Sequence, residues 1–92
     1  MKKYVIDCKE IMDRISAHEY IAKILEFPEY YGKNLDALFD CLTDLGKCTI
    51  EIINVDSLAC IAEYAGPLLA VFKEAAECNN RISIVINEEP EK

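Results

Sequence analysis

Three aspartates, Asp36, Asp40 and Asp44, are the residues whose type and spacing most clearly allow chemistry in this sequence. They recur every four residues, so on an α-helix, which turns about 100° per residue, they form one row, and Thr43 joins them there. Neighbouring carboxylates in such a row repel each other by about 0.2–0.5 kcal/mol per pair. A sequence selected only for stability would place a lysine in this row.

Catalysis and cation binding are two chemistries that such a row could serve. Carboxylates at this spacing lie about 5–6 Å apart, close to the roughly 5–5.5 Å between the acid and the nucleophile of retaining glycosidases. An exposed helix face, however, provides no pocket that would separate their pKa values. Three aspartates on one rigid helix also cannot wrap six or more oxygens around calcium. Both chemistries are therefore disfavoured.

A turn-rich segment with two adjacent tyrosines precedes the acidic row. Residues 28–32 read Pro-Glu-Tyr-Tyr-Gly. Tyrosine combines a rigid apolar face with a polar tip, and protein interfaces are enriched in it. The residues alone leave two interpretations open: an acidic and aromatic binding surface, or a solvated helix face beside core tyrosines.

The helix that carries the row is predicted from about Leu35 to Leu45, with Asn34 as its N-cap and Gly46 as its C-terminal stop. Its apolar residues fall on a different face from the aspartates. They are Leu35, Leu38, Phe39, Leu42 and Leu45.

Three β-rich runs, at residues 4–7, 49–55 and 82–87, alternate with helical patterns. This order predicts an α/β fold of two layers, a three-stranded parallel sheet with about four helices on one face. We expect one domain over residues 1–92, with a frayed polar tail at residues 88–92.

The other helices are predicted from their caps. A capping box at Ser16 and Glu19 begins the first helix, which ends before Pro28. Asp56 or Ser57 caps a short third helix that Gly66 ends, and a fourth helix runs from Pro67 to Asn79. His18 falls at the edge of the first helix's apolar stripe, so we expect a partly buried, hydrogen-bonded histidine.

The composition favours a basic protein as the partner. Net charge is −7, from 17 acidic and 10 basic residues. Phosphate backbones and anionic membrane surfaces repel such a chain, so neither nucleic acid nor membrane is expected to bind it. Opposite charges would steer a basic protein towards it.

The five cysteines, an odd number with no C-x-x-C spacing, suit neither a disulfide framework nor a zinc site. We expect reduced thiols in the cytoplasm. The sequence also shows no signal peptide and no run approaching about 18 apolar residues.

Residues 28–43, PEYYGKNLDALFDCLT, closely resemble the central segment of the barstar family, inhibitors of barnase-type ribonucleases. The family pattern reads P-E-Y-Y-G, one variable residue, N-L-D-A-L, an aromatic residue and D-C-L-T. The resemblance extends more weakly to residues 2–6, His18, 71–75 and 82–86, and so spans nearly the whole chain.

The resemblance implies a non-catalytic inhibitor without cofactor or metal, which plugs the active site of a basic secreted ribonuclease in a one-to-one complex. Asp40 would take the place of a substrate phosphate, Asp36 would bond the rim of the cleft, and Tyr30 would pack on the ribonuclease's histidine. The other implied contacts are Asn34, Leu35, Phe39, Thr43, Asp44 and, at the periphery, Glu74.

Three positions depart from the family pattern. Phe39 stands where the family often has tryptophan, and Asp44 and Leu45 replace a glycine and a tryptophan. Asp44 adds charge, and adds bulk where glycine permits close approach. An alternative function is therefore an interaction or immunity domain for another basic toxin or for a partner that is not a nuclease.

Overall fold

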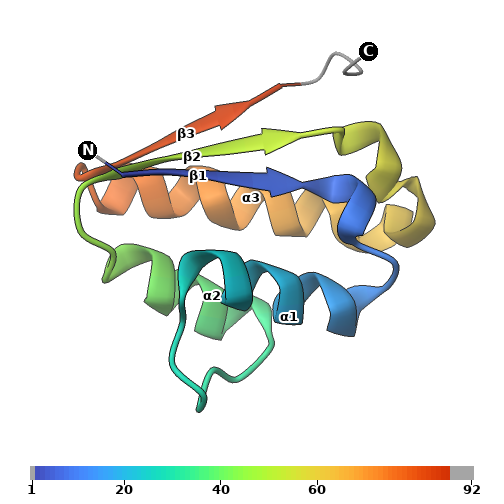
Figure 1. The fold of residues 1–92 in the computed structure, drawn as a ribbon, viewed down its shortest axis with the longest axis horizontal. Coiled ribbons are helices and arrows are strands. Elements are labelled where there is room, and N and C mark those ends of the chain that lie inside the picture. Colours follow the sequence, from blue (N-terminus) through green and yellow to red (C-terminus); the bar gives the residue numbers. More distant parts are fainter. Residues whose placement is uncertain (1, 88–92) are drawn as a thin grey trace.

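Isoleucine and valine, which fit a buried pleated surface, dominate the strands of the sheet. In the computed structural model, which describes residues 2–87, β1 (Lys2–Asp7), β2 (Cys48–Ile53) and β3 (Ile82–Ile86) form a parallel sheet in the order β1-β2-β3. Figure 1 shows α1 (Arg14–Leu25), α2 (Leu35–Thr43) and α3 (Ala62–Cys78) on one side of this sheet. The predicted α/β fold is confirmed, with three α-helices within residues 2–87 instead of about four.

The central strand β2 separates the two faces of the sheet. Its alternate residues Cys48, Ile50 and Ile52 are buried towards the helices. The strand ends before the predicted residue 55 because Asn54 adopts a left-handed backbone with φ +56°. The frayed tail predicted for residues 88–92 lies outside the described residues.

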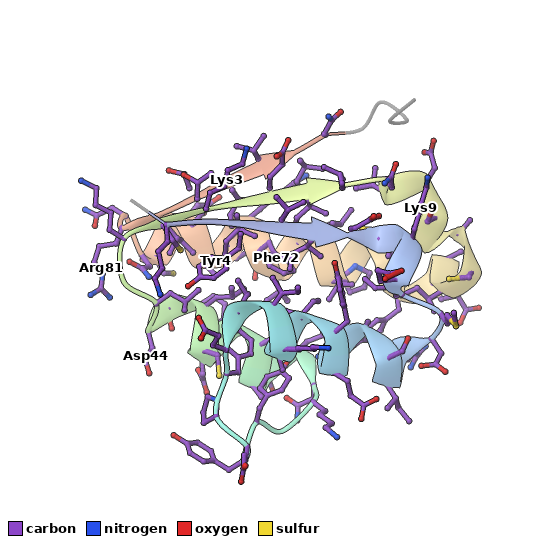
Figure 2. All side chains as sticks on the ribbon, in the orientation of Figure 1. Lys3, Tyr4, Lys9, Asp44, Phe72 and Arg81 are labelled. Atoms are coloured by element: carbon purple, nitrogen blue, oxygen red, sulfur yellow. The ribbon has the colours of Figure 1, made fainter. Side chains whose placement is uncertain are left out.

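All three helices contribute side chains to one core beneath the sheet. Ile21 of α1 and Leu38 and Leu42 of α2 are fully buried there. Phe72 of α3 lies between the sheet and the helices (Figure 2). The face predicted for the second helix is therefore correct.

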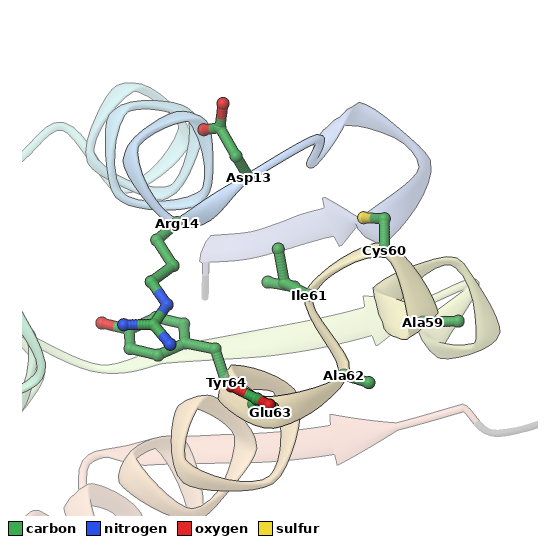
Figure 3. Close-up of a pocket in the computed structure, with 8 residues that line it drawn as sticks. All are labelled: Asp13, Arg14, Ala59, Cys60, Ile61, Ala62, Glu63 and Tyr64. Carbon is green, nitrogen blue, oxygen red and sulfur yellow. The ribbon is translucent and has the colours of Figure 1, made fainter.

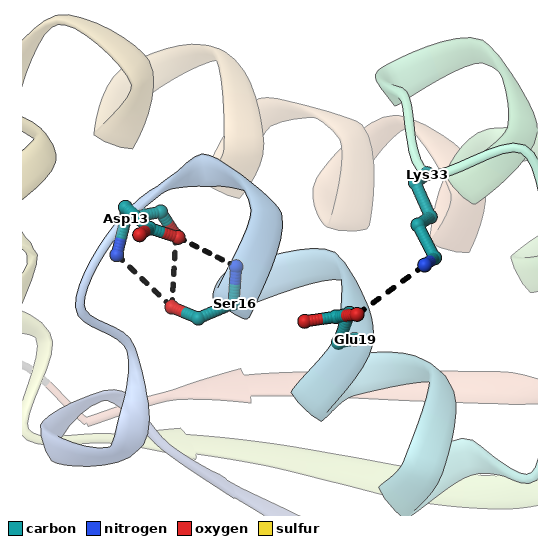
Figure 4. Close-up of polar contacts among 4 residues, drawn as sticks. All are labelled: Asp13, Ser16, Glu19 and Lys33. Carbon is teal, nitrogen blue, oxygen red and sulfur yellow. Dashed lines mark hydrogen bonds and ion pairs between the residues drawn. The ribbon is translucent and has the colours of Figure 1, made fainter.

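The first helix begins earlier than predicted. Its capping box is formed by Asp13 and Ser16 (Figure 4): Asp13 Oδ1 accepts a hydrogen bond from the Ser16 amide at 2.7 Å, and Ser16 Oγ accepts one from the Asp13 amide at 3.0 Å. The box predicted at Ser16 and Glu19 is wrong, because Asp13 caps as well as serine and lies three residues before it. Glu19 instead pairs with Lys33.

The predicted third and fourth helices are also corrected. Residues 55–61 form a 3-10 helix, η2 (Val55–Ile61), and α3 then continues through Gly66 and Pro67. Neither Asp56 nor Ser57 caps an α-helix, since the N-cap of α3 is Ile61. Pro67 is the sixth residue of α3, where its missing N–H removes one helical hydrogen bond.

Length and composition alone would allow η2 and α3 together, Val55–Cys78, to cross a membrane, with a mean hydropathy of 1.4 over 18 residues. The sequence had given no such expectation. In the fold, Leu58, Leu68 and Phe72 of this segment are buried in the core. These apolar side chains of the segment therefore pack in the core of the protein.

Candidate functional site

The acidic row lies on the solvent side of α2, because the buried leucines Leu38 and Leu42 fix the opposite side in the core. Asp36, Asp40 and Asp44 are all exposed, as predicted. Within residues 2–87, none of their carboxylates makes a hydrogen bond or an ion pair. The ion pairs there are Lys2–Glu26, Lys3–Glu51 and Lys33–Glu19. The row therefore presents carboxylate oxygens that water alone can satisfy in the free protein.

Two shallow grooves flank this row. The first lies between α2 and α3 and is lined by Leu35, Asp36, Phe39, Asp40, Val71 and Glu74. The second lies between α2 and the segment after α1, and its lining includes Tyr30, Asp40 and Asp44. Asp40 lines both grooves and so stands on the ridge between them. We call the exposed side chains of Tyr30, Asp36, Asp40, Asp44 and Glu74 the acidic surface.

The two adjacent tyrosines of the loop have opposite environments. Tyr30 is 88 % exposed, whereas Tyr31 is buried in the core. Tyr31 is held by its amide, which donates to the Pro28 carbonyl at 3.0 Å, and by its ring, which lies 5.1 Å from that of Phe27. One tyrosine thus anchors the loop, and its neighbour is presented to solvent.

The loop is joined to α2 by a cap and to α1 by an ion pair. Asn34 Oδ1 accepts from the Ala37 amide at 2.8 Å, as predicted for an N-cap, and Asn34 Nδ2 donates to the Gly32 carbonyl at 3.2 Å. Lys33 Nζ lies 3.3 Å from Glu19 Oε2 (Figure 4). The Asn34 side chain is therefore engaged within the chain, and its contact with a partner stays a prediction.

The C-terminal end of α2 is fixed by a distant residue that the sequence did not reveal. The helix ends at Thr43, before the predicted Leu45, and Gly46 is not its stop. Asn79 Nδ2 donates to the carbonyls of Leu42 at 3.1 Å and Leu45 at 3.0 Å, and the Leu42 carbonyl also accepts from the Leu45 amide at 3.3 Å. No local sequence signal marks this contact, because Asn79 lies more than 30 residues away along the chain.

Asp44 sits where the family pattern has glycine. Its backbone, with φ −90° and ψ −11°, is a conformation open to any residue. Its side chain points away from the end of α2 (Figure 2). Thr43, half-buried beside it, donates its hydroxyl to the Asp40 carbonyl at 2.9 Å. The aspartate therefore adds negative charge to the acidic surface without backbone strain.

The local electrostatics disfavour a reactive thiol beside the row. Burial raises the pKa of Cys41, and the charges of Asp44 and Asp40 raise it further. The last turn of α2 contains no basic residue. Within residues 2–87, no three His, Cys, Asp or Glu side chains come together as metal ligands would. Among the described residues, no ion pair offsets the charge of the three aspartates.

His18 connects the loop to two helices. Its side chain is only 1 % exposed. The Nδ1 atom of His18 lies 2.7 Å from the Tyr31 hydroxyl, and the Nε2 atom lies 2.6 Å from the Tyr64 hydroxyl. A neutral imidazole can satisfy both, because it donates at one nitrogen and accepts at the other. The Arg14 guanidinium lies 4.8 Å from the Tyr64 ring centroid, in a depression that contains none of the predicted contact residues (Figure 3). The predicted hydrogen-bonded histidine is confirmed, and it is buried more completely than expected.

The stability of the protein should decrease as the pH falls below about 6.5. Burial lowers the pKa of His18 from its ordinary value of 6.5. Below that value the unfolded chain takes up a proton that the folded state resists, so the free energy of unfolding falls by at most about 1.4 kcal/mol per pH unit. Urea unfolding at pH 7.5, 6.5 and 5.5 would measure this loss. His18→Gln cannot titrate and should show a flatter profile; equal slopes would contradict the assignment.

Comparison with known proteins agrees with the fold. Residues 1–87 match the family Barstar, described as barnase inhibitor. The chain is 40% identical over 81 residues to the "Putative ribonuclease inhibitor YrdF" of Bacillus subtilis (strain 168), a match that covers 84% of this chain and 88% of that protein. This protein therefore belongs to the barstar family.

Proposed function

We propose that this protein is a non-catalytic inhibitor of a basic ribonuclease and plugs its active site with α2 and the preceding loop. The observation that carries the proposal is the row of exposed carboxylates, which have no ion-pair partner within residues 2–87, beside a tyrosine that is 88 % exposed. Family membership supports the ribonuclease as the class of target.

The chemistry of the two surfaces is complementary. A ribonuclease cleft binds a polyanion and so presents cationic groups. Carboxylates on a helix can occupy phosphate positions, and they contain no bond that the enzyme can cleave. Arginines bind carboxylate and phosphate with the same forked geometry. The repulsion along the row would then be relieved only in the complex.

The position of Asp40 on the ridge suits insertion into a cleft. We assign to it the central contact, with Asp36 and Glu74 towards one groove and Tyr30 and Asp44 towards the other. Leu35 and Phe39 form an apolar border of the first groove. Asn34 and Thr43 stand at the two ends of α2, where they would complete the contact.

Rigid presentation of these residues favours tight binding. The core leucines, the Asn34 cap and the Asn79 bridge fix α2 at its centre and at both ends. His18 and the Lys33–Glu19 pair fix the loop. A preorganised surface loses little conformational entropy on association.

Catalysis by the same residues is not part of the proposal. The grooves are shallow, and Asp36 and Asp40 are open to water. His18, the single histidine of the sequence, is enclosed by Tyr31 and Tyr64. We place the inhibitor in the cytoplasm of the cell that produces the ribonuclease, which agrees with five free cysteine thiols.

Titration of a barnase-type ribonuclease tests the proposal. Cleavage of RNA should fall to zero near one equivalent of this protein. The association rate should decrease as salt rises, because attraction between opposite charges is screened. Undiminished cleavage at a large excess would refute a barnase-type target, and the same titration with other basic toxins would then examine the alternative of an immunity domain.

A further inference from the structure

The edge strand β3 lacks the features that usually keep sheet edges from pairing. Its sequence, Ile-Ser-Ile-Val-Ile, has no charge and no proline. The other edge, β1, contains Lys2, Lys3 and Asp7. Charged residues and proline are the common protection of exposed edges. The two edges of this sheet therefore differ in their capacity to accept another strand.

The backbone groups of β3 that face away from the sheet can be identified. The Cys48 amide donates to the Arg81 carbonyl at 3.1 Å, and the Asn87 amide donates to the Ile52 carbonyl at 2.8 Å. Alternate residues of a strand direct their backbone groups to the same side, so Ser83 and Val85 also bond β2. The outward groups are therefore the amides and carbonyls of residues 84 and 86 and the carbonyl of residue 82. The residue 82 amide also faces outward but donates to the Asn79 carbonyl.

The side chains along this edge are also open. A groove runs between β3 and α3, lined by Lys73, Ala76, Ile82, Ser83, Ile84 and Ile86. On the other face of the sheet, Val85 is 47 % exposed. A strand added here would cover apolar surface on both faces.

We propose that β3 pairs antiparallel with β3 of a second copy of this chain, across a two-fold axis at Ile84, to form a six-stranded sheet. This alignment places residue 82 opposite residue 86 of the second copy and residue 84 opposite itself. The amide and carbonyl of residue 84 then bond their symmetry mates, and the residue 86 amide donates to the residue 82 carbonyl of the second copy, as a symmetric dimer requires; the residue 86 carbonyl stays open to water because the residue 82 amide already donates to Asn79. The edge is thus complementary to itself.

The charges beside the edge are compatible with this pairing. Lys73, which lines the groove beside β3, and Glu77, one turn further along α3, are both exposed and carry opposite charges. The whole chains repel, since each has a net charge of −7. The uncharged strand is therefore where two copies can approach, and the dimer should strengthen as salt rises.

The dimer leaves both acidic surfaces free. β3 and α2 lie at opposite sides of the molecule in Figure 1. On α3, the residues beside β3 (Lys73 and Ala76) point to the opposite side from those beside α2 (Val71 and Glu74). A dimer would bind two partner molecules, and its formation does not depend on the ribonuclease.

Two variants with matched positions test the pairing without any ribonuclease. Residues 83 and 85 lie opposite each other across the proposed axis, both exposed. Ser83→Lys/Val85→Lys sets like charges face to face, whereas Ser83→Glu/Val85→Lys sets opposite charges face to face. Val5→Lys, at a residue 40 % exposed on β1, is the control for added charge at the other edge.

Molar mass should be measured by light scattering, with circular dichroism to confirm folding, from about 1 µM to 1 mM, the range for a small interface. We expect the parent, Val5→Lys and Ser83→Glu/Val85→Lys to reach twice the monomer mass, and more readily at high salt. The double lysine variant should stay monomeric. A parent that stays monomeric at every concentration, or a double lysine variant that dimerises like the parent, would overturn the proposal.

Discussion

Replacement of Asp40 by alanine should weaken inhibition of the cognate ribonuclease by between about 10²-fold and about 4 × 10³-fold and leave the fold intact. Removing one partner of a desolvated ion pair costs about 3–5 kcal/mol, because the other charge stays buried without compensation. Each 1.4 kcal/mol corresponds to about tenfold in the dissociation constant. The inhibition constant, measured by titration at fixed salt, gives the effect directly.

The geometry explains why Asp40 should matter more than its neighbours. Asp40 lines both grooves, whereas Asp36 lines only the first and Asp44 only the second. Asp36→Ala is therefore expected to weaken inhibition less than Asp40→Ala does. Thermal stability should not fall in Asp40→Ala, since this carboxylate has no partner among residues 2–87 and its removal reduces repulsion along the helix. In Asp36→Ala the relief of repulsion is offset by the loss of a negative charge from the first turn of α2, so stability should change little.

Asp40→Asn provides the matched control, because it keeps the size of the side chain and removes only its charge. It should lose nearly as much inhibition as the alanine variant if Asp40 replaces a phosphate. Full inhibition by Asp40→Ala would show that the anchor lies elsewhere on the acidic surface. Strong inhibition by Asp40→Asn together with weak inhibition by Asp40→Ala would assign the contact to hydrogen bonding and not to charge.

The sequence predicted best what depends on local periodicity. The row of aspartates and the leucines of α2 follow from 3.6 residues per turn, and the structure places them on opposite sides of the helix. Three β-rich runs likewise predicted the three strands, the last two of them rich in isoleucine and valine. The orientation of Asp36, Asp40 and Asp44 could thus be obtained from spacing alone.

The structure adds what depends on contacts between distant residues. Asn79 ends α2, and Tyr64 meets His18 across 46 positions of the sequence. Periodicity carries no information on such pairs. The two tyrosines of the loop differ for the same reason: Tyr31 is buried because a specific histidine can accept or donate a hydrogen bond there, and no local rule separates it from Tyr30.

The acidic surface extends further than the family pattern implies. Asp44 occupies a right-handed helical conformation, so the backbone does not require the glycine of the pattern. The additional charge lines the groove that Tyr30 also lines. A partner that fits this surface should carry a cationic group opposite Asp44, in addition to those that meet Asp36 and Asp40.

Replacement of Leu38 by alanine should have the opposite consequence from replacement of Asp40. The Leu38 side chain is fully buried, and truncation of such a leucine costs about 2–5 kcal/mol through lost burial and the cavity that remains. Urea unfolding would measure this loss in the free energy of unfolding. Ile15→Ala removes a branched aliphatic side chain that is 65 % exposed, and should change stability by only about 0.5 kcal/mol.

Inhibition by Leu38→Ala separates the role of the core from that of the acidic surface. The folded fraction of this variant keeps Asp36 and Asp40 in place, so it should still inhibit near one equivalent under conditions where it is folded. Unchanged stability would contradict the assignment of the two faces of α2. Normal folding with lost inhibition would mean that Leu38 contacts the partner, which its position beneath the helix does not allow without opening the core.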